Sequence, residues 1–190
     1  MSRQEYTKVS RFPSVTKILS PYSGYDQIPP WHLEKAAERG TTVHAHCAAI
    51  ALGEWAPPPK EELRGYVQSA RLWLDAFMDE PLSVEEELEE PELEYCGHPD
   101  LVIRSVKLGG NILIDWKTPV AVHRKVWGAQ LAAYNNLIEK SRGIVIHRLG
   151  SLRLDVRGGI AKFDEFTANR VSYWSAFFGA LIAHRFFSTK

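Results

Sequence analysis

The 190-residue chain lacks three features that would each point to a class of protein: many cysteines, a strong net charge and a long apolar run. It has only two cysteines, Cys47 and Cys96, so we expect no disulfide framework, zinc site or four-cysteine iron–sulfur cluster. Its formal net charge is zero, and the support that a strongly basic chain would give to nucleic-acid binding is missing. No apolar run approaches the length of a membrane span, and the polar residues 1–10 do not suggest a signal peptide. We therefore expect no membrane contact and a reducing, cytoplasmic location.

The composition that remains is ordinary for a globular protein, with 45% hydrophobic and 24% charged residues. One domain, 1–190, is the simplest organisation at this length. The hydrophobic periodicity predicts helices over residues 31–52, 60–79, 120–140 and 164–187. It predicts extended segments over residues 85–94, 144–149 and 152–156, with a turn at Gly150-Ser151.

This order of elements predicts an α/β fold with a mixed central β-sheet flanked by helices. Residues 1–30 would form an N-terminal arm and loop, 31–80 a helical segment and 82–190 the α/β core. A glycine at position 143 is expected to end the third helix, and the prolines among residues 53–59 interrupt the chain after the first.

Two adjacent apolar runs joined by Gly109-Gly110 predict a β-hairpin. If these glycines close the turn, Asp115 pairs with Arg104 and Lys117 pairs with Val102. Because alternate strand residues point the same way, one face carries the polar side chains Asp100, Arg104, Asp115 and Lys117. The other face carries the apolar side chains Leu101, Ile103, Ile112, Ile114 and Trp116, which we expect to pack against the core.

Two carboxylates in a half-buried sheet repel one another unless a cation joins them. Asp100 and Asp115 are therefore candidate metal ligands. Lys117, which lies diagonal to Asp100 in this register, would be within reach of a common ligand.

The spacing of Pro99-Asp100 and Asp115-x-Lys117 resembles the PD-(D/E)xK nuclease superfamily of metal-dependent phosphodiesterases. Other segments match in the family's order between residues 12 and 135. Residues 39–44 (RGTTVH) resemble the Gly-Thr-x-x-His segment of RecB-like nuclease domains, and residues 130–134 (QLAAY) resemble the helix that follows their lysine. Residues 13–19 (PSVTKIL) and Trp31 resemble the opening of phage nucleases and of the mitochondrial genome maintenance exonuclease.

The resemblance implies a restriction-endonuclease-like core and a site for one or two Mg²⁺ or Mn²⁺ ions. Its ligands would be His44, Asp100, Asp115 and the backbone carbonyl of Trp116. Hard oxygen donors with a single imidazole suit these ions. Lys117 would orient or deprotonate the attacking water, although a lysine beside two acids can also be a plain salt bridge.

Gln130 and Tyr134 stand four residues apart and share a helix face. The resemblance gives them a catalytic role in contacting DNA phosphate or the attacking water; the alternative is ordinary helix packing. A further acid is expected among the glutamates of residues 85–94, but the sequence does not distinguish them.

Contacts to nucleic acid are expected from the basic pair Arg124 and Lys125, which could equally be solvated surface charges. The aromatic residues Tyr22 and Tyr25 could stack on bases. Trp31 could do the same, but core packing is an equal alternative for it.

The leading hypothesis is a metal-dependent DNA nuclease, most simply an exonuclease that acts on a single-stranded end during replication, recombination or repair. Its partners would be DNA and recombination or replication proteins, in the cytoplasm of a bacterium or a phage-infected host. One alternative is a non-catalytic nucleic-acid-binding or assembly module that retains the nuclease fold. The joint presence of the motif residues argues against it. A subunit that is active only as an oligomer is a further alternative.

Overall fold

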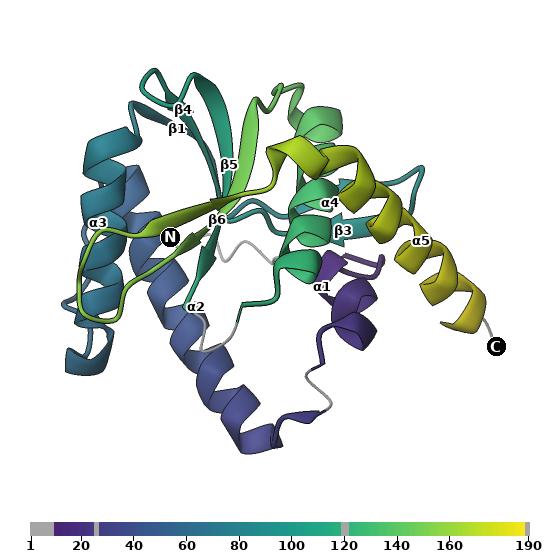
Figure 1. The fold of residues 1–190 in the computed structure, drawn as a ribbon, viewed down its shortest axis with the longest axis horizontal. Coiled ribbons are helices and arrows are strands. Elements are labelled where there is room, and N and C mark those ends of the chain that lie inside the picture. Colours follow the sequence, from purple (N-terminus) through teal and green to yellow (C-terminus); the bar gives the residue numbers. More distant parts are fainter. Residues whose placement is uncertain (1–9, 25–26, 119–121, 189–190) are drawn as a thin grey trace, which may run out of the picture.

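A computed structural model describes residues 10–24, 27–118 and 122–188 and shows the expected α/β architecture (Figure 1). The helices are α1 (Val15–Leu19), α2 (Pro30–Leu52), α3 (Arg64–Phe77), α4 (Arg124–Arg142) and α5 (Arg170–Ser188). Short 3-10 helices lie at η1 (Ser20–Tyr22), η3 (Glu61–Leu63) and η4 (Thr167–Asn169). The strands are β1 (Glu80–Val84), β2 (Leu88–Glu90), β3 (Tyr95–Gly97), β4 (Leu101–Ser105), β5 (Gly110–Lys117), β6 (Arg148–Arg153) and β7 (Lys162–Glu165).

The central sheet has five strands in the order β1-β4-β5-β6-β7. Its neighbours run antiparallel except for β5 and β6, which are parallel. The parallel pair is joined by α4, as a parallel connection requires. β2 and β3 form a separate small antiparallel pair.

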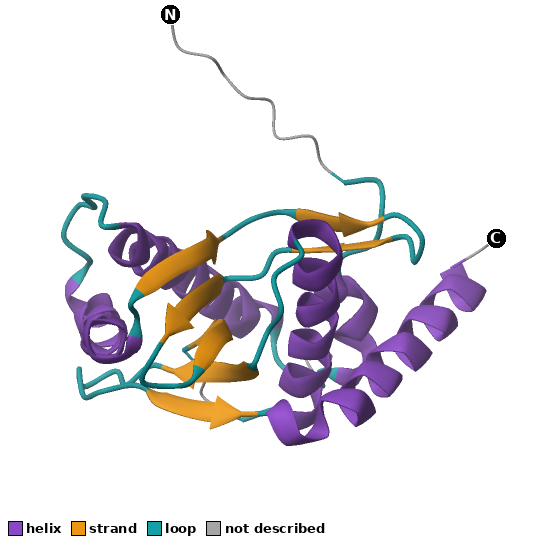
Figure 2. Ribbon diagram, turned by 90° about the horizontal axis from the view of Figure 1, so that it is seen from above, coloured by secondary structure: helices purple, strands orange, loops and turns teal. Residues whose placement is uncertain are grey.

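Helices cover both faces of the central sheet, as Figure 2 shows. Each face has its own buried cluster because successive strand residues point to opposite sides. On one face, side chains from α2 and α3 pack against the predicted apolar set Leu101, Ile103, Ile112, Ile114 and Trp116. On the other, Val102 and Leu113 join residues of α1, α4 and α5. Within the described ranges, no helix is long and apolar enough to cross a membrane.

The predicted register of the β4–β5 hairpin is wrong by four residues. Arg104 pairs with Asn111 rather than Asp115, and Val102 pairs with Leu113 rather than Lys117. The ladder closes at Ser105 and Gly110, and the turn between them takes four residues, with a bond from the Gly109 N–H to the Val106 carbonyl of 3.2 Å. The Ser105 hydroxyl stabilises this longer turn by accepting a 3.1 Å bond from the Leu108 N–H.

The polar and apolar faces nevertheless come out as expected, because an even shift in register leaves each side chain on its own face. Asp115 now follows Ile114, the partner of Leu101, so it lies opposite Asp100. Asp100 is therefore directly beside Asp115, and Lys117, two residues further along β5, is still a diagonal neighbour of Asp100.

Three other expectations need correction. Residues 85–94 contain only the short strand β2 and a turn, and the strand that joins the central sheet there is β1. The expected turn at Gly150-Ser151 is the middle of β6. The expected terminal helix, 164–187, begins only at Arg170, because the end of β7 and the 3-10 helix η4 occupy its expected first residues.

The helix predictions are more accurate. α2 ends at a left-handed Gly53, and α4 ends at a left-handed Gly143, the residue expected to stop it. α4 begins at Arg124; residues 119–121, part of the expected helix, lie outside the described residues, as do residues 1–9 of the expected arm.

Candidate functional site

Acidic and hydroxyl side chains form a row across the central sheet. Glu85 follows Val84, the partner of Leu101, and its N–H donates a 3.0 Å bond to the carbonyl of Asp100. Asp100 lies next to Asp115, which pairs with Ser151 of β6, and Ser151 pairs with Asp164 of β7. One polar position from each strand or strand end thus lies in the same row: Glu85, Asp100, Asp115, Ser151 and Asp164.

His44 reaches this row from α2. Its Nδ1 lies 3.5 Å from Asp100 Oδ1 and 3.9 Å from Glu85 Oε1. Ligand atoms of His44, Glu85 and Asp100 all lie within 4.8 Å of one another, close enough to share one metal ion. The structure thus brings together two of the expected ligands, His44 and Asp100, with the carboxylate of Glu85.

The electrostatics of this group favour a bound cation. Burial by itself would lower the pKa of His44, but the charge and hydrogen bond of Asp100, with Asp115 and Glu85, raise it to about 9. Burial and the charge of Asp100 raise the pKa of Glu85 to about 7. Glu85 Oε1 is buried and, among the described residues, has no hydrogen-bond partner. The excess negative charge and the unbonded oxygen fit a divalent ion held by carboxylates and one imidazole.

The backbone of Trp116, whose carbonyl is an expected ligand, lies at the edge of this cluster. The N–H of Trp116 donates a 2.7 Å bond to Asp100 Oδ2, which fixes that carboxylate against β5. The carbonyl of Trp116 lies 3.1 Å from His44 Nε2. The Trp116 side chain packs in the apolar cluster under α2 and α3, so its backbone is the part that faces the site.

Asp115 is the start of a polar chain that runs to α4. Its Oδ2 lies 2.6 Å from Lys117 Nζ and accepts a 3.4 Å bond from the Ser151 hydroxyl. Lys117 also donates to Gln130 Oε1 at 3.2 Å, and Gln130 Nε2 donates to the Tyr134 hydroxyl at 3.1 Å. The structure therefore brings all the expected catalytic side chains close together. Asp115 was expected as a metal ligand, but its nearest charged partner is Lys117.

Burial shapes the chemistry of this chain as well. It raises the pKa of Asp115, with help from the charge of Asp100 and against the charge of Lys117. Burial also raises the pKa of Tyr134 far above its usual range, so this phenol stays protonated and can only donate or accept a hydrogen bond.

The residues expected to contact nucleic acid are more dispersed. Arg124 and Lys125 lie in the first turn of α4, and the Arg124 guanidinium bonds Asp164 at 3.1 Å, so it is not a simple solvated charge. Tyr22 is exposed in η1, and Trp31 is exposed and stacked on His32, which rules out core packing for Trp31. Tyr25 lies outside the described residues.

Sequence reasoning did not single out Glu85, Ser151 or His98. Glu85 adopts a positive φ of 49° and also lies 3.3 Å from His98 Nδ1. Of the glutamates between residues 85 and 94, it is the one that directly follows β1. The segment before it, Glu80–Val84 (EPLSV), is only partly apolar, so the sequence carries little signal that could have found Glu85.

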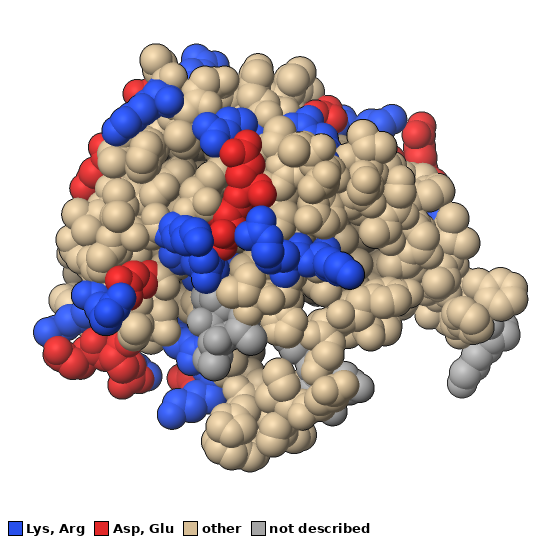
Figure 3. All heavy atoms as spheres, viewed as in Figure 1, with Lys and Arg blue, Asp and Glu red and all other residues tan. Residues whose placement is uncertain are grey.

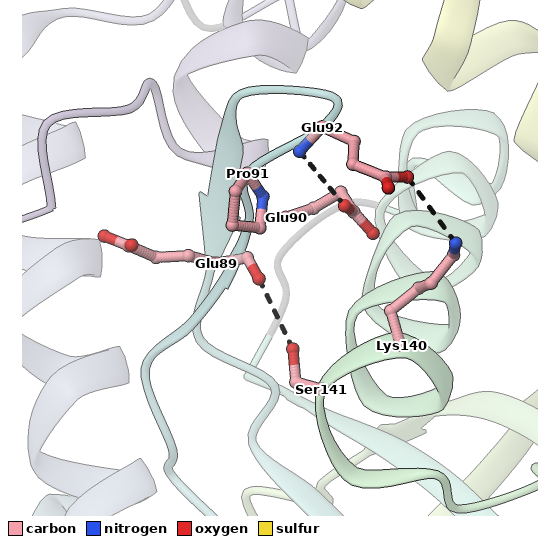
Figure 4. A pocket seen from close by; sticks show the side chains of 6 residues that line it. All are labelled: Glu89, Glu90, Pro91, Glu92, Lys140 and Ser141. Atoms are coloured by element: carbon pink, nitrogen blue, oxygen red, sulfur yellow. Dashed lines mark hydrogen bonds and ion pairs between the residues drawn. The ribbon is translucent and has the colours of Figure 1, made fainter.

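Two cavities lie away from this site. A pocket of about 350 Å³ lies between the turn after β2 and the end of α4, lined by Glu89, Glu90, Pro91, Glu92, Lys140 and Ser141 (Figure 4). A larger one, of about 900 Å³, lies between residues 10–14 and the end of α5. Neither contains a residue of the candidate site.

No protein-family model matches the chain, and no curated protein matches it either. The candidate site therefore stands on its own residues and geometry.

Proposed function

We propose that this protein is a metal-dependent nuclease of the PD-(D/E)xK superfamily that hydrolyses phosphodiester bonds of DNA, acting as an exonuclease on a single-stranded end. One observation carries the proposal: ligand atoms of His44, Glu85 and Asp100 gather within 4.8 Å of one another, beside the Asp115–Lys117 pair. An acidic group that can hold a divalent ion, with an ammonium group beside it, is the combination that phosphodiester hydrolysis needs.

Mg²⁺ or Mn²⁺ would be held by His44, Glu85 and Asp100, with Asp115 and the Trp116 carbonyl beside them. When bound, such an ion supplies charge neutralisation on the phosphate and lowers the pKa of a bound water.

The remaining steps belong to the chain. Lys117, held between Asp115 and Gln130, orients the attacking water and stabilises the negative charge that develops on the phosphate. Gln130, held in turn by Tyr134, fixes the position of the lysine ammonium group. Asp115 holds the Lys117 ammonium group in this position through an ion pair of 2.6 Å.

The direct test is hydrolysis of end-labelled single-stranded DNA, double-stranded DNA and RNA in Mg²⁺, Mn²⁺ or excess chelator. We expect ion-dependent shortening of single-stranded DNA, and the product ladder gives the direction of degradation. Asp115→Asn should lose most of the activity while circular dichroism and thermal melting show an intact fold, because asparagine keeps the shape of the buried side chain.

The matched control is Asp75→Asn, which makes the same change at an exposed position on α3 and should retain full activity. Full activity in excess chelator would contradict the metal mechanism. If the wild-type protein binds DNA but hydrolyses none of the substrates with any ion, it is the non-catalytic module instead.

A further inference from the structure

A second group of charges lies on the same face of the sheet as Lys117, on the next two strands. Lys117 pairs with Arg153 of β6, and Arg153 pairs with Lys162 of β7. The three cations therefore form a row beside the polar row that contains Asp115, Ser151 and Asp164. Two strand spacings make this cation row about 10 Å long.

The carboxylate of Asp164 organises the far end of this row. Asp164 is buried, with 6% of its side chain exposed, and binds Arg153 Nε through Oδ2. Its Oδ1 lies 3.1 Å from Arg124 Nη1 and 4.0 Å from Lys162 Nζ. Arg124 is further held by the Phe166 ring, 4.8 Å from its guanidinium carbon, and by the carbonyl of Glu165. The guanidinium groups of Arg124 and Arg153 are thus held by protein contacts before any ligand arrives.

The charges in this group do not balance. Arg124, Arg153 and Lys162 bring three positive charges to the single negative charge of Asp164, an excess of two in a chain whose net charge is zero. The neighbouring Glu165 does not correct the excess, because it is paired with Arg148 at 2.7 Å.

The excess charge is accessible to a ligand. The side chain of Lys162 is 70% exposed and that of Arg124 is 50% exposed. On the face of the molecule that Figure 3 shows, Lys and Arg side chains lie on both sides of a group of acidic side chains near the middle. Guanidinium groups prearranged by a buried carboxylate, with donors left over, are suited to the oxygens of a phosphate.

We propose that Arg124, Arg153 and Lys162 bind a backbone phosphate of the nucleic-acid strand whose neighbouring phosphodiester is cleaved beside Lys117. This inference rests on the proposed function for the identity of the strand. Asp164 is a positioning residue here, since it acts through the cations that it holds. The row of cations from Lys117 to Lys162 then gives the direction in which the bound strand leaves the metal site across β5, β6 and β7.

The test is binding of a labelled single-stranded oligonucleotide in Ca²⁺ and again in excess chelator, over a range of salt concentrations. Lys162→Ala and Arg124→Ala should each weaken binding about three- to tenfold, and each should lower the slope of log affinity against log salt by about 0.7, the value for one phosphate contact on a single strand.

A scan of neutral methylphosphonate linkages locates the contact. At one position near the cleaved bond, the neutral linkage should weaken binding to the wild-type protein and leave binding to Lys162→Ala unchanged. Lys140→Ala is the matched control, because Lys140 is also exposed and also faces one acid, Glu92, at 3.8 Å; its affinity and salt slope should equal those of the wild type.

Wild-type affinity and salt slope in both Lys162→Ala and Arg124→Ala would overturn the inference, as would a wild-type protein that binds no oligonucleotide. Displacement of the oligonucleotide by an equal concentration of inorganic phosphate would show a site for a free anion and would also overturn it. The two proposals fail separately. If the wild-type protein hydrolyses DNA but the variants bind it as tightly as the wild type does, only the phosphate site is contradicted. If binding depends on Lys162 but the wild-type protein hydrolyses no substrate, the phosphate site is supported and the proposed nuclease activity is contradicted.

Discussion

Glu85 shows how much one residue contributes to the candidate site. It is one of many glutamates in its segment, yet it alone among them belongs to the group with His44 and Asp100. Its positive φ turns the chain out of β1 at the point where its carboxylate meets the two other ligands. A non-glycine residue in this conformation has a backbone cost that the surrounding structure must offset.

We predict that Glu85→Gln lowers the affinity for Mn²⁺ about tenfold or more, because it removes a charge from the ligand group and leaves the shape unchanged. Isothermal titration with Mn²⁺ alone measures this directly. Glu87→Gln, at an exposed position two residues further on, is the control and should bind as the wild type does. Equal affinity in Glu85→Gln and Glu87→Gln would exclude Glu85 as a ligand.

We predict a different effect for Lys117→Ala. Its affinity for single-stranded DNA should stay close to that of the wild type while turnover falls by several orders of magnitude, as expected for a group that acts mainly in the transition state. Binding measured in chelator and single-turnover hydrolysis measured in Mg²⁺ separate the two quantities. Lys60→Ala, at an exposed lysine, is the control. If Lys117→Ala weakens binding and leaves turnover unchanged, Lys117 is a phosphate anchor and its proposed role is wrong.

At the scale of the element, β6 determines how the two halves of the site meet. It runs parallel to β5 and carries Ser151 beside Asp115 and Arg153 beside Lys117. It also pairs with β7, which brings Asp164 and Lys162 into the same rows. Gly150 allows this arrangement, because a side chain there would meet the Phe163 ring and the Asp164 carbonyl across the strand pair.

We predict that Gly150→Ala lowers the free energy of unfolding by about 1–3 kcal/mol through this overlap. An added Cβ would lie 2.5 Å from the Phe163 ring and 2.8 Å from the Asp164 carbonyl oxygen, and the latter is backbone that cannot rotate away. Denaturant titration measures the change. Gly179→Ala in α5, where an added Cβ meets nothing within 4 Å, should instead raise stability by about 0.5–1 kcal/mol. If Gly150→Ala leaves the free energy of unfolding unchanged, β6 and β7 can move apart to accommodate the added Cβ without losing stability.

At the scale of the whole molecule, charge is distributed unevenly although the total is zero. The acids Glu85 and Asp100 gather at one side of the polar row, and the cations around Asp164 gather at the other. A net charge of zero gives little support for a broad duplex-binding surface, so we expect affinity for nucleic acid to come from a few phosphate contacts and stacked bases.

We predict that degradation requires a free, single-stranded end. A linear single strand with bulky adducts at both ends should persist, and a closed single-stranded circle should remain intact under conditions in which the uncapped linear strand is degraded. Gel electrophoresis of the three substrates after incubation in Mg²⁺ gives the answer, and the uncapped strand is the control. Rapid cutting of the circle would identify an endonuclease.

The sequence by itself determined the features that depend on neighbouring residues. The helical period placed α2, and Gly143 stopped α4, because both signals lie within a few residues of the structure that they specify. The period of two along β4 and β5 put Asp100, Asp115 and Lys117 on one face, and that assignment survived a wrong register because the error was even.

Only the tertiary structure decided which residues meet across strands. The four-residue turn set the register that puts Asp100 beside Asp115, and the pairing of β1 with β4 selected Glu85 from its neighbouring glutamates. The pairing of β6 with β7 brought Arg153 and Lys162 to Asp164. These contacts join residues that are distant in sequence or not distinguished by it, and their free energy depends on how whole strands pack, so no local pattern of residues specifies them.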